Sequence, residues 1–421
     1  MPDFSKRELL GEMVAHKSYT PQGQRQLADY IATLVNRKGL GDAKVVDYPA
    51  DANFHNVDRD AHPANVVIDI GQGTEETILW HGHIDTVPPP TGRPNFPRNP
   101  HQLISDPNNQ EVAYGLGSYD MLGGVAAFIL ALRNIKVDTC RRIRILLVSY
   151  EEDLSQGTHA ALHPSKDLVG DAHGIVSTEI PVGGTLNDDP FLLIGRQGRV
   201  GMQLEVHGPG MHMGRVTREA LKRALAPTRE GLVRTRLGDI YLPEHPEDHL
   251  KLMPESLVVP GQNGSNKIKA LSVPHEQGIS LNVSYSNPHL DAMQIHAMMR
   301  DEIARILGDT NFELHLQDRG GIPTTKPWLE SPGHPFVQNG LTYAKQAHGR
   351  DVKLRAGGAT ADEAILVHAK NIPAIGFPPM GEDEHLPDER VSLSSIEKHV
   401  VPFLQGIAAH EGPITRNRSA A

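Results

Sequence analysis

The chain has 421 residues, a length that predicts two domains. Hydrophobic residues make up 38% and charged residues 22%, which is typical of a globular protein. The formal net charge of −10 argues against nucleic acids and anionic membranes as partners, because phosphates require a basic surface. A single cysteine, Cys140, and the lack of a signal peptide or of a run of roughly 20 apolar residues lead us to expect a cytoplasmic protein.

The first half of the chain alternates helical and strand patterns. The expected elements are a helix whose apolar stripe runs from Leu27 to Val35 and that ends at Gly39, strands over Asn65–Ile70 and Thr77–Asp85, an apolar helix over Leu122–Ile135, and strands over Ile143–Val148 and Gly174–Thr178. This alternation predicts an α/β domain with a mostly parallel sheet that is covered on both faces. Such sheets place their chemistry in the loops beyond the carboxyl ends of the strands.

The middle of the chain has a different pattern. The strands expected over Val200–Val206, Ile279–Tyr285 and Asn311–Leu316 and an amphipathic helix over Leu290–Leu307 predict a small antiparallel α+β domain of ferredoxin-like type. A helix from Pro335 and strands over Val352–Arg355 and Pro373–Phe377 then resume the first pattern. We therefore expect a main domain over residues 1–195 and 317–421, interrupted by an inserted domain over residues 196–316.

Side chains that bind metals follow several of the expected strands. Alternation places His81, His83 and Asp85 on one face at the end of a strand. A histidine that binds a metal usually has its second ring nitrogen held, often by a carboxylate, and Asp85 lies in position to do so. Two histidines packed in a sheet and bonded to the backbone remain the alternative for this motif alone.

Acidic residues follow the next strands. Asp120 stands in a glycine-rich loop before an apolar helix, where it could also be a simple helix N-cap. Glu151 and Glu152 follow the strand Ile143–Val148, and Glu179 follows the next strand. Adjacent carboxylates are often a solvated turn, but here one glutamate could bind a metal while the other takes a proton from water. Their shared position predicts a metal site at one sheet edge.

Together these segments resemble metallopeptidase family M20. The matching motifs are His83-Ile-Asp85-Thr-Val-Pro88, Gly117-Ser-Tyr-Asp120-Met-Leu-Gly-Gly124 and Glu151-Glu152, in the family's order. The family includes carboxypeptidases, dipeptidases, aminoacylases, acetylornithine deacetylases and succinyl-diaminopimelate desuccinylases. The resemblance implies two zinc ions, for which Co²⁺ or Mn²⁺ can substitute, and an inserted domain that acts as a lid and forms a homodimer.

The resemblance also implies a role for each matching residue. Glu151 corresponds to the general base, Asp85 to the carboxylate that orients a ligand, and His81 to no ligand, so we expect His81 to be structural or to lie behind the ligands. The metal ligands implied are His83, Asp120, Glu152, Glu179 and His385. By itself, His385 in the segment Gly381–Glu389 would be interpreted as a surface histidine in an acidic loop.

Further matches concern the substrate. His212 resembles the histidine that reaches the partner subunit's active site and polarises the scissile carbonyl, and Asn266 resembles the lid asparagine, although Lys269 replaces the usual proline. Gly358 and Thr360 resemble a loop beside the substrate, with Ala359 in place of the second glycine.

One departure bears on the substrate. Ser284 takes the place of an arginine that many relatives carry, and serine cannot form the bidentate pair that arginine makes with a carboxylate. Recognition of a free substrate carboxylate is therefore in doubt, or another group provides it. The predicted function is hydrolysis of an amide bond in a short peptide or N-acyl amino acid. The alternatives are a deacylase, a carbamoylase or an esterase on the same fold, and a binding protein without catalysis.

Overall fold

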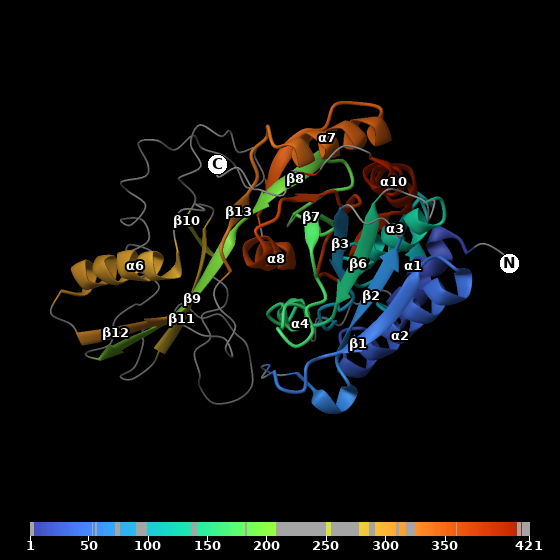
Figure 1. The fold of residues 1–421 in the computed structure, drawn as a ribbon. Helices are drawn as coiled ribbons and strands as arrows, with labels where there is room; N and C mark the ends of the chain where they lie inside the picture. The colour runs from blue at the N-terminus through green and yellow to red at the C-terminus, as the bar shows by residue number, and fades with distance from the viewer. Residues whose placement is uncertain are drawn as a thin grey trace.

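The computed structural model describes residues 4–414 apart from 53, 55–56, 72–75, 90–98, 136–140, 182, 208–249, 254–277, 286–290, 309–310, 317–324, 359 and 411–413. Its largest part is a nine-stranded mixed sheet between two layers of helices, and a four-stranded antiparallel sheet lies to one side of it (Figure 1). Among the described residues, no helix is both long enough and apolar enough to span a membrane.

The main sheet is mixed, and its central strands are parallel. Strands β6, β3, β7 and β15 pair in parallel, and so do β14 and β8, whereas β1, β2 and β13 pair antiparallel with their neighbours and β15 pairs antiparallel with β8. The predicted mostly parallel sheet is therefore confirmed in a mixed form. The strands, in spatial order, are β1 (Asp42–Asp47), β2 (Ala64–Ile70), β6 (Arg142–Val148), β3 (Thr77–His83), β7 (Ala172–Ser177), β15 (Ala374–Gly376), β8 (Phe191–Arg196) and β13 (Trp328–Leu329), with β14 (Lys353–Gly357) also paired to β8.

Helices cover both faces of this sheet, as the alternation of strands and helices predicts. One face carries α1 (Lys6–Ala15), α2 (Pro21–Lys38), α3 (Leu122–Leu132), α7 (Pro335–His348) and α10 (Val401–Ala409). The other face carries α4 (Gln156–Ala161) and α8 (Asp362–Lys370). The pleat explains the two cores, because Trp80 of β3 packs in the first core and Leu79 in the second.

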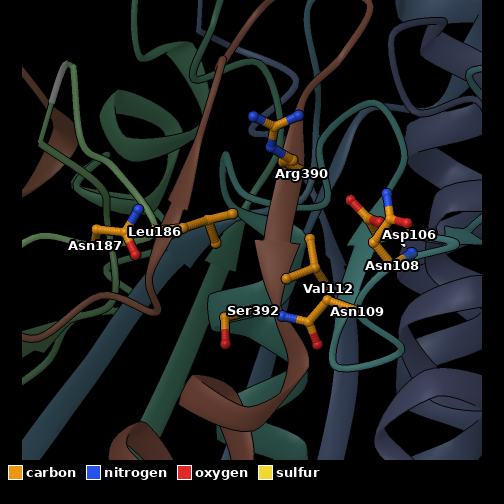
Figure 2. A pocket seen from close by; sticks show the side chains of 8 residues that line it. All are labelled: Asp106, Asn108, Asn109, Val112, Leu186, Asn187, Arg390 and Ser392. Atoms are coloured by element: carbon orange, nitrogen blue, oxygen red, sulfur yellow. Dashed lines mark hydrogen bonds between the residues drawn. The ribbon is translucent and has the colours of Figure 1, made fainter.

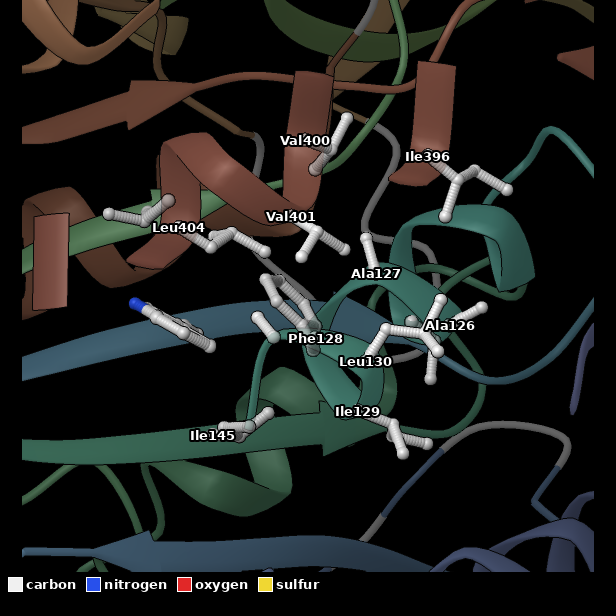
Figure 3. Packing of buried hydrophobic residues seen from close by; sticks show 14 of the residues in the cluster. Ala126, Ala127, Phe128, Ile129, Leu130, Ile145, Ile396, Val400, Val401 and Leu404 are labelled. Carbon is white, nitrogen blue, oxygen red and sulfur yellow. The ribbon is translucent and has the colours of Figure 1, made fainter. Parts of the chain in front are cut away.

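The larger core forms around α3, whose residues are all buried. Figure 3 shows Phe128 and Ile129 of α3 close to Ile145 of β6, with Val401 and Leu404 of α10 on the opposite side of the helix. A helix that is apolar all around must be covered on every side. This burial fixes the start of α3, and with it the loop that carries Asp120.

The remaining described strands form two antiparallel sheets. The expected inserted sheet is present as β10 (Leu250–Met253), β11 (Gly278–Tyr285), β9 (Gly198–His207) and β12 (Asn311–Leu316), with α6 (Ala292–Leu307) against it. A further sheet, β16 (Gly381–Glu382), β17 (Arg390–Ser392), β5 (Val112–Tyr114) and β4 (Ile104–Ser105), was not predicted. Its strands have two or three residues, too few for alternation to reveal them.

Candidate metal centre

The candidate ligands gather where the central strands of the main sheet end. β3 ends at His83, β6 leads directly to Glu151 and Glu152, and β7 leads to Glu179. Because these strands run in parallel, their carboxyl ends share one edge of the sheet. Asp120 reaches the same edge from the loop before α3. Sequence-distant side chains thus form one cluster.

The first group of donor atoms is His83, Asp120 and Glu179. The His83 Nε2 atom lies 3.2 Å from Asp120 Oδ1 and 3.3 Å from Glu179 Oε2. All three side chains are largely buried, and their donor atoms lie within 4.8 Å of one another. One imidazole nitrogen and two carboxylate oxygens suit a divalent metal such as Zn²⁺ or Mn²⁺.

The second group is Asp120, Glu152 and His385. The His385 Nε2 atom lies 3.0 Å from Asp120 Oδ2 and 2.9 Å from Glu152 Oε1. Asp120 therefore directs one carboxylate oxygen to each group. The His385 side chain is 45% exposed, which leaves this second group open to solvent. The motif alone would place His385 on the surface, but in the structure its ring lies against the carboxylates of Asp120 and Glu152, which are mostly shielded from solvent.

Asp85 contacts His83 and also the two glutamates that follow β6. The His83 Nδ1 atom lies 2.9 Å from the backbone carbonyl oxygen of Asp85 and 3.6 Å from its Oδ1 atom. The two carboxylate oxygens accept the backbone N–H groups of Glu151 and Glu152, each at 3.0 Å. Asp85 thus fixes the ring orientation of His83 mainly through its backbone. Its carboxylate links the end of β3 to the two glutamates after β6.

The charges of the cluster suit cations. Burial lowers the pKa of His385, but its hydrogen bonds to Asp120 and Glu152 raise the pKa to about 11. Burial raises the pKa of Glu152 to about 7 and also raises that of Glu179. Burial alone would raise the pKa of Asp120, yet hydrogen bonds from His385 and His83 hold it below its usual range. Buried carboxylates packed this closely need positive charge nearby.

Glu151 lies beside the two groups. A carboxylate oxygen of Glu151 lies within 4.8 Å of the ligand atoms of His83 and Glu152. Burial and the charge of Asp362 raise the pKa of Glu151 well above its usual value. A carboxylate that holds a proton readily and lies beside a metal site has the properties of a general base.

His81 lies behind Glu151, in a buried polar region. Its Nε2 atom is 3.4 Å from Thr158 Oγ1 and 3.8 Å from Asp362 Oδ2, while Thr158 Oγ1 donates to the same Asp362 oxygen at 2.7 Å. Burial and the charge of His83 lower the pKa of His81 to about 3, so this ring is neutral. The sequence alone had suggested no role for Asp362, which follows the Gly358–Thr360 loop.

The loop that carries Asp120 depends on glycine. Gly117 has φ +75°, and a Cβ atom there would lie 2.2 Å from Thr86 Cγ2. A Cβ atom on Gly124 would lie 2.3 Å from Thr178 Oγ1, next to Glu179. The alternative that Asp120 caps the helix is wrong, because α3 begins after Met121 without a side-chain cap.

Two buried residues near the ligands were missed by the sequence analysis. Glu389 accepts backbone N–H groups of the Asp120 loop. Arg196, at the end of β8, donates to the carbonyl oxygens of Ile180 at 2.6 Å and Glu179 at 2.9 Å. The one available signal was that Glu389 follows His385 closely in a quoted motif. Nothing local in the sequence marks Arg196.

The expected substrate residues are only partly placed. Gly358 and Thr360 follow β14 and precede α8, whose first residue is Asp362. His212 and Asn266 lie outside the described residues, as does the side chain of Ser284, although the backbone of Ser284 belongs to β11.

A pocket of about 400 Å³ lies apart from the two metal groups. Figure 2 shows Arg390 and Ser392 of β17 at this pocket, with Leu186 on one side and Asn109 on the other. None of its described lining residues belongs to either metal group.

Comparison with known proteins identifies relatives of this chain. The chain is 28% identical over 344 residues to a succinyl-diaminopimelate desuccinylase of Stenotrophomonas maltophilia, covering 78% of this chain and 82% of the relative. A Sulfurovum desuccinylase is 25% identical over 413 residues, covering 95% and 97%.

Solved structures share the fold at low identity. A dipeptidase of Saccharomyces cerevisiae superposes with a TM-score of 0.67 at 15% identity, covering 96% of this chain and 95% of that one. Human carnosine dipeptidase 1 gives a TM-score of 0.63 at 15% identity, covering 95% and 96%. The sequence model described as peptidase family M20/M25/M40 matches residues 79–407. The resemblance stated from the motifs is thus confirmed, and the chain belongs to peptidase family M20/M25/M40, a family of metallopeptidases and amidohydrolases.

Proposed function

We propose that this protein is a two-zinc hydrolase that cleaves an amide bond in a short peptide or an N-acyl amino acid. The observation that carries the proposal is the pair of three-donor groups that share Asp120, with Glu151 beside them. Each group offers three protein ligands and leaves further positions for water and substrate, as catalytic metal sites require. His83 and Glu179 would complete one site, and Glu152 and His385 the other.

The donor set supports zinc as the proposed metal. Imidazole and carboxylate ligands suit Zn²⁺, and also accept Co²⁺ or Mn²⁺. Two such ions, when bound, make water acidic enough to attack near neutral pH and polarise the carbonyl under attack. Asp85 would keep the His83 ring in the ligating orientation, because its carbonyl oxygen lies 2.9 Å from Nδ1.

Glu151 would move the proton. We assign it to accept a proton from the attacking water and to deliver that proton to the leaving amine. Its placement supports this role, since a ligand atom of His83 and one of Glu152 lie within 4.8 Å of a Glu151 carboxylate oxygen. Asp362 lies behind Glu151, and its negative charge opposes loss of the proton from Glu151.

Substrate recognition would involve the inserted domain. We propose residues 196–316 as a lid that forms a homodimer, with His212 polarising the scissile carbonyl across the dimer and Asn266, Gly358 and Thr360 contacting the substrate. Ser284 in place of the usual arginine favours substrates whose free carboxylate is held elsewhere, or that lack one.

A deacylase is the second candidate within the same chemistry. The relatives that match over most of the chain are succinyl-diaminopimelate desuccinylases, whereas the yeast and human proteins of similar fold are dipeptidases. Both names describe hydrolysis of an amide, so the shared reaction is better supported than either substrate. Hydrolysis of N-succinyl amino acids without hydrolysis of dipeptides would favour the deacylase.

Glu151→Gln tests the assignment of the general base. The substitution removes proton transfer while keeping the shape of the side chain, so we expect kcat to fall by at least a factor of about 10² with metal content retained. Asp153→Asn is the matched control, because Asp153 belongs to the same acidic segment but bonds to Gln156 at 3.3 Å. Near-normal turnover in Glu151→Gln, or equal losses in both variants, would overturn the assignment.

A further inference from the structure

Glu389 has a buried carboxylate that accepts hydrogen bonds from backbone N–H groups. Its Oε2 atom accepts from Gly117 at 2.8 Å, and its Oε1 atom accepts from Tyr119 at 2.9 Å and Asp120 at 3.0 Å. The residue is 1% exposed. Three donors in a four-residue loop therefore converge on one side chain that lies about 270 positions away in the sequence.

The same residue connects that loop to the segment of His385. The backbone carbonyl oxygen of Glu389 accepts from Gly115 at 3.1 Å, so main chain and side chain both bind the Asp120 loop. The Glu389 N–H donates to Leu386, the residue after His385, in a turn closed at 3.1 Å. The two ligands of the open metal group, Asp120 and His385, thus sit on segments that Glu389 joins.

We propose that Glu389 is a positioning residue that sets the place of Asp120 relative to His385 and so determines the affinity of the second metal site. This inference rests on the proposed two-metal function, because it assigns the ligands that function requires. Glu389 itself donates no atom to either metal group. It acts through the backbone of the residue that both groups share.

A carboxylate is required because every partner is a donor. Both oxygens of a carboxylate accept hydrogen bonds, whereas a glutamine offers one oxygen and one NH₂ group. In Glu389→Gln the NH₂ group would face either the Gly117 N–H or the N–H groups of Tyr119 and Asp120. One side of the loop would lose its acceptor, and the buried donor would be left unpaired. The loop would then shift without any ligand being removed.

Metal binding by the full chain tests this role directly. The apoprotein is titrated with Zn²⁺ in competition with a chromophoric chelator, and Co²⁺ absorption reports the coordination at each site. Three variants are compared with the unchanged protein: Glu389→Gln, Glu389→Asp and Glu76→Gln. Glu76 is the matched control, since its carboxylate also accepts a backbone N–H, from Ile414 at 2.8 Å, at the start of β3 and far from the ligands.

We expect Glu389→Gln to weaken the second metal by a factor of about 10 to 100 while the first changes by less than about threefold, a range typical for residues that orient ligands. Glu389→Asp should recover part of the loss, and Glu76→Gln should bind both metals normally. Unchanged affinities, or equal weakening of both metals, in Glu389→Gln would overturn the proposal. Should Glu389→Gln fail to fold, Glu389→Asp decides, because a normal second site in that variant would refute it.

The result separates this role from the proposed function. An unchanged protein that binds no metal contradicts the two-metal function itself. If the protein without substitutions binds two metals and the Glu389→Gln variant binds both with the same affinities, only the proposed role of Glu389 is contradicted.

Discussion

The ion pair between Arg196 and Glu363 offers a sharp test of how the site is supported. Arg196 is 0% exposed and Glu363 1% exposed at the side chain, so neither charge has access to bulk water. Arg196 also donates to the carbonyl oxygens of Ile180 and Glu179, which connects the pair to a candidate ligand. Glu363→Gln would leave the guanidinium charge without its counter-ion.

Breaking a buried pair from one side costs about 3–5 kcal/mol, whereas exposed pairs contribute about 0–1 kcal/mol. We therefore expect Glu363→Gln to lower the free energy of unfolding by about 3 kcal/mol or more. Asp189→Asn, which removes the pair with Lys353 at 2.7 Å and 62% and 65% exposure, should lower the free energy of unfolding far less, because both charges are already in water.

Urea unfolding followed by tryptophan fluorescence measures both variants. The chain has 2 tryptophans, Trp80 and Trp328, and both are buried in strands of the main sheet, so the signal reports on this sheet. Replacing both partners, Arg196→Met with Glu363→Leu, should cost less than the sum of the single changes, because no unpaired charge remains. A loss below about 1 kcal/mol for Glu363→Gln, or additivity in the double variant, would refute the reasoning.

Three further outcomes follow from particular residues. Glu152→Gln should lower the zinc content measured by mass spectrometry from two equivalents to one, since it removes a carboxylate from the second group alone; two tightly bound equivalents would contradict the grouping. Gly117→Ala should lower the melting temperature more than Gly39→Ala, because both have positive φ (+75° and +64°) but only the first would bring a Cβ atom within 2.2 Å of another residue; equal shifts would disprove the steric argument. Burial and the charge of His399 lower the pKa of His348 to about 4 from 6.5, so between these pH values the unfolded chain binds the extra proton and stability falls as the pH falls. His348→Gln should remove this pH-dependent loss, which partial exposure limits to on the order of 1 kcal/mol, and an unchanged slope in pH-dependent urea unfolding would show that another group is responsible.

The central strands of the main sheet could be predicted from the sequence, because each strand is marked by a local run of apolar residues. The runs Ile78–Trp80 and Ile145–Val148 are continuous and apolar, as expected for strands buried on both faces. The antiparallel pairing of β2 with β6 could not be predicted, since the apolar pattern of a buried strand is the same whether it pairs parallel or antiparallel with its neighbour. The short strand β17, which brings Arg390 beside Tyr114, has three residues and leaves no periodic signal.

The gathering of the candidate ligands at one sheet edge could be predicted for a related reason. Asp120, Glu152 and Glu179 each follow a strand or precede a helix with a clear pattern, so their common edge follows from the sheet. Glu389 and Arg196 act through the backbone of distant segments, and such contacts depend on the finished fold. Asp85 makes further contacts that the sequence did not predict, because its carboxylate, 3.6 Å from His83 Nδ1, also accepts from Glu151 and Glu152, and its carbonyl oxygen lies 2.9 Å from the same ring nitrogen.

The proposed function of this protein is metal-dependent hydrolysis of an amide. The most direct measurement is the rate at which the apoprotein, given increasing equivalents of Zn²⁺ or Co²⁺, hydrolyses dipeptides and N-acetyl, N-succinyl and N-carbamoyl amino acids. We predict no hydrolysis without metal, a rise that is complete at two equivalents for at least one amide, and loss of activity with a chelator. Binding of two metals without cleavage of any amide, or cleavage that a chelator leaves unchanged, would contradict the account.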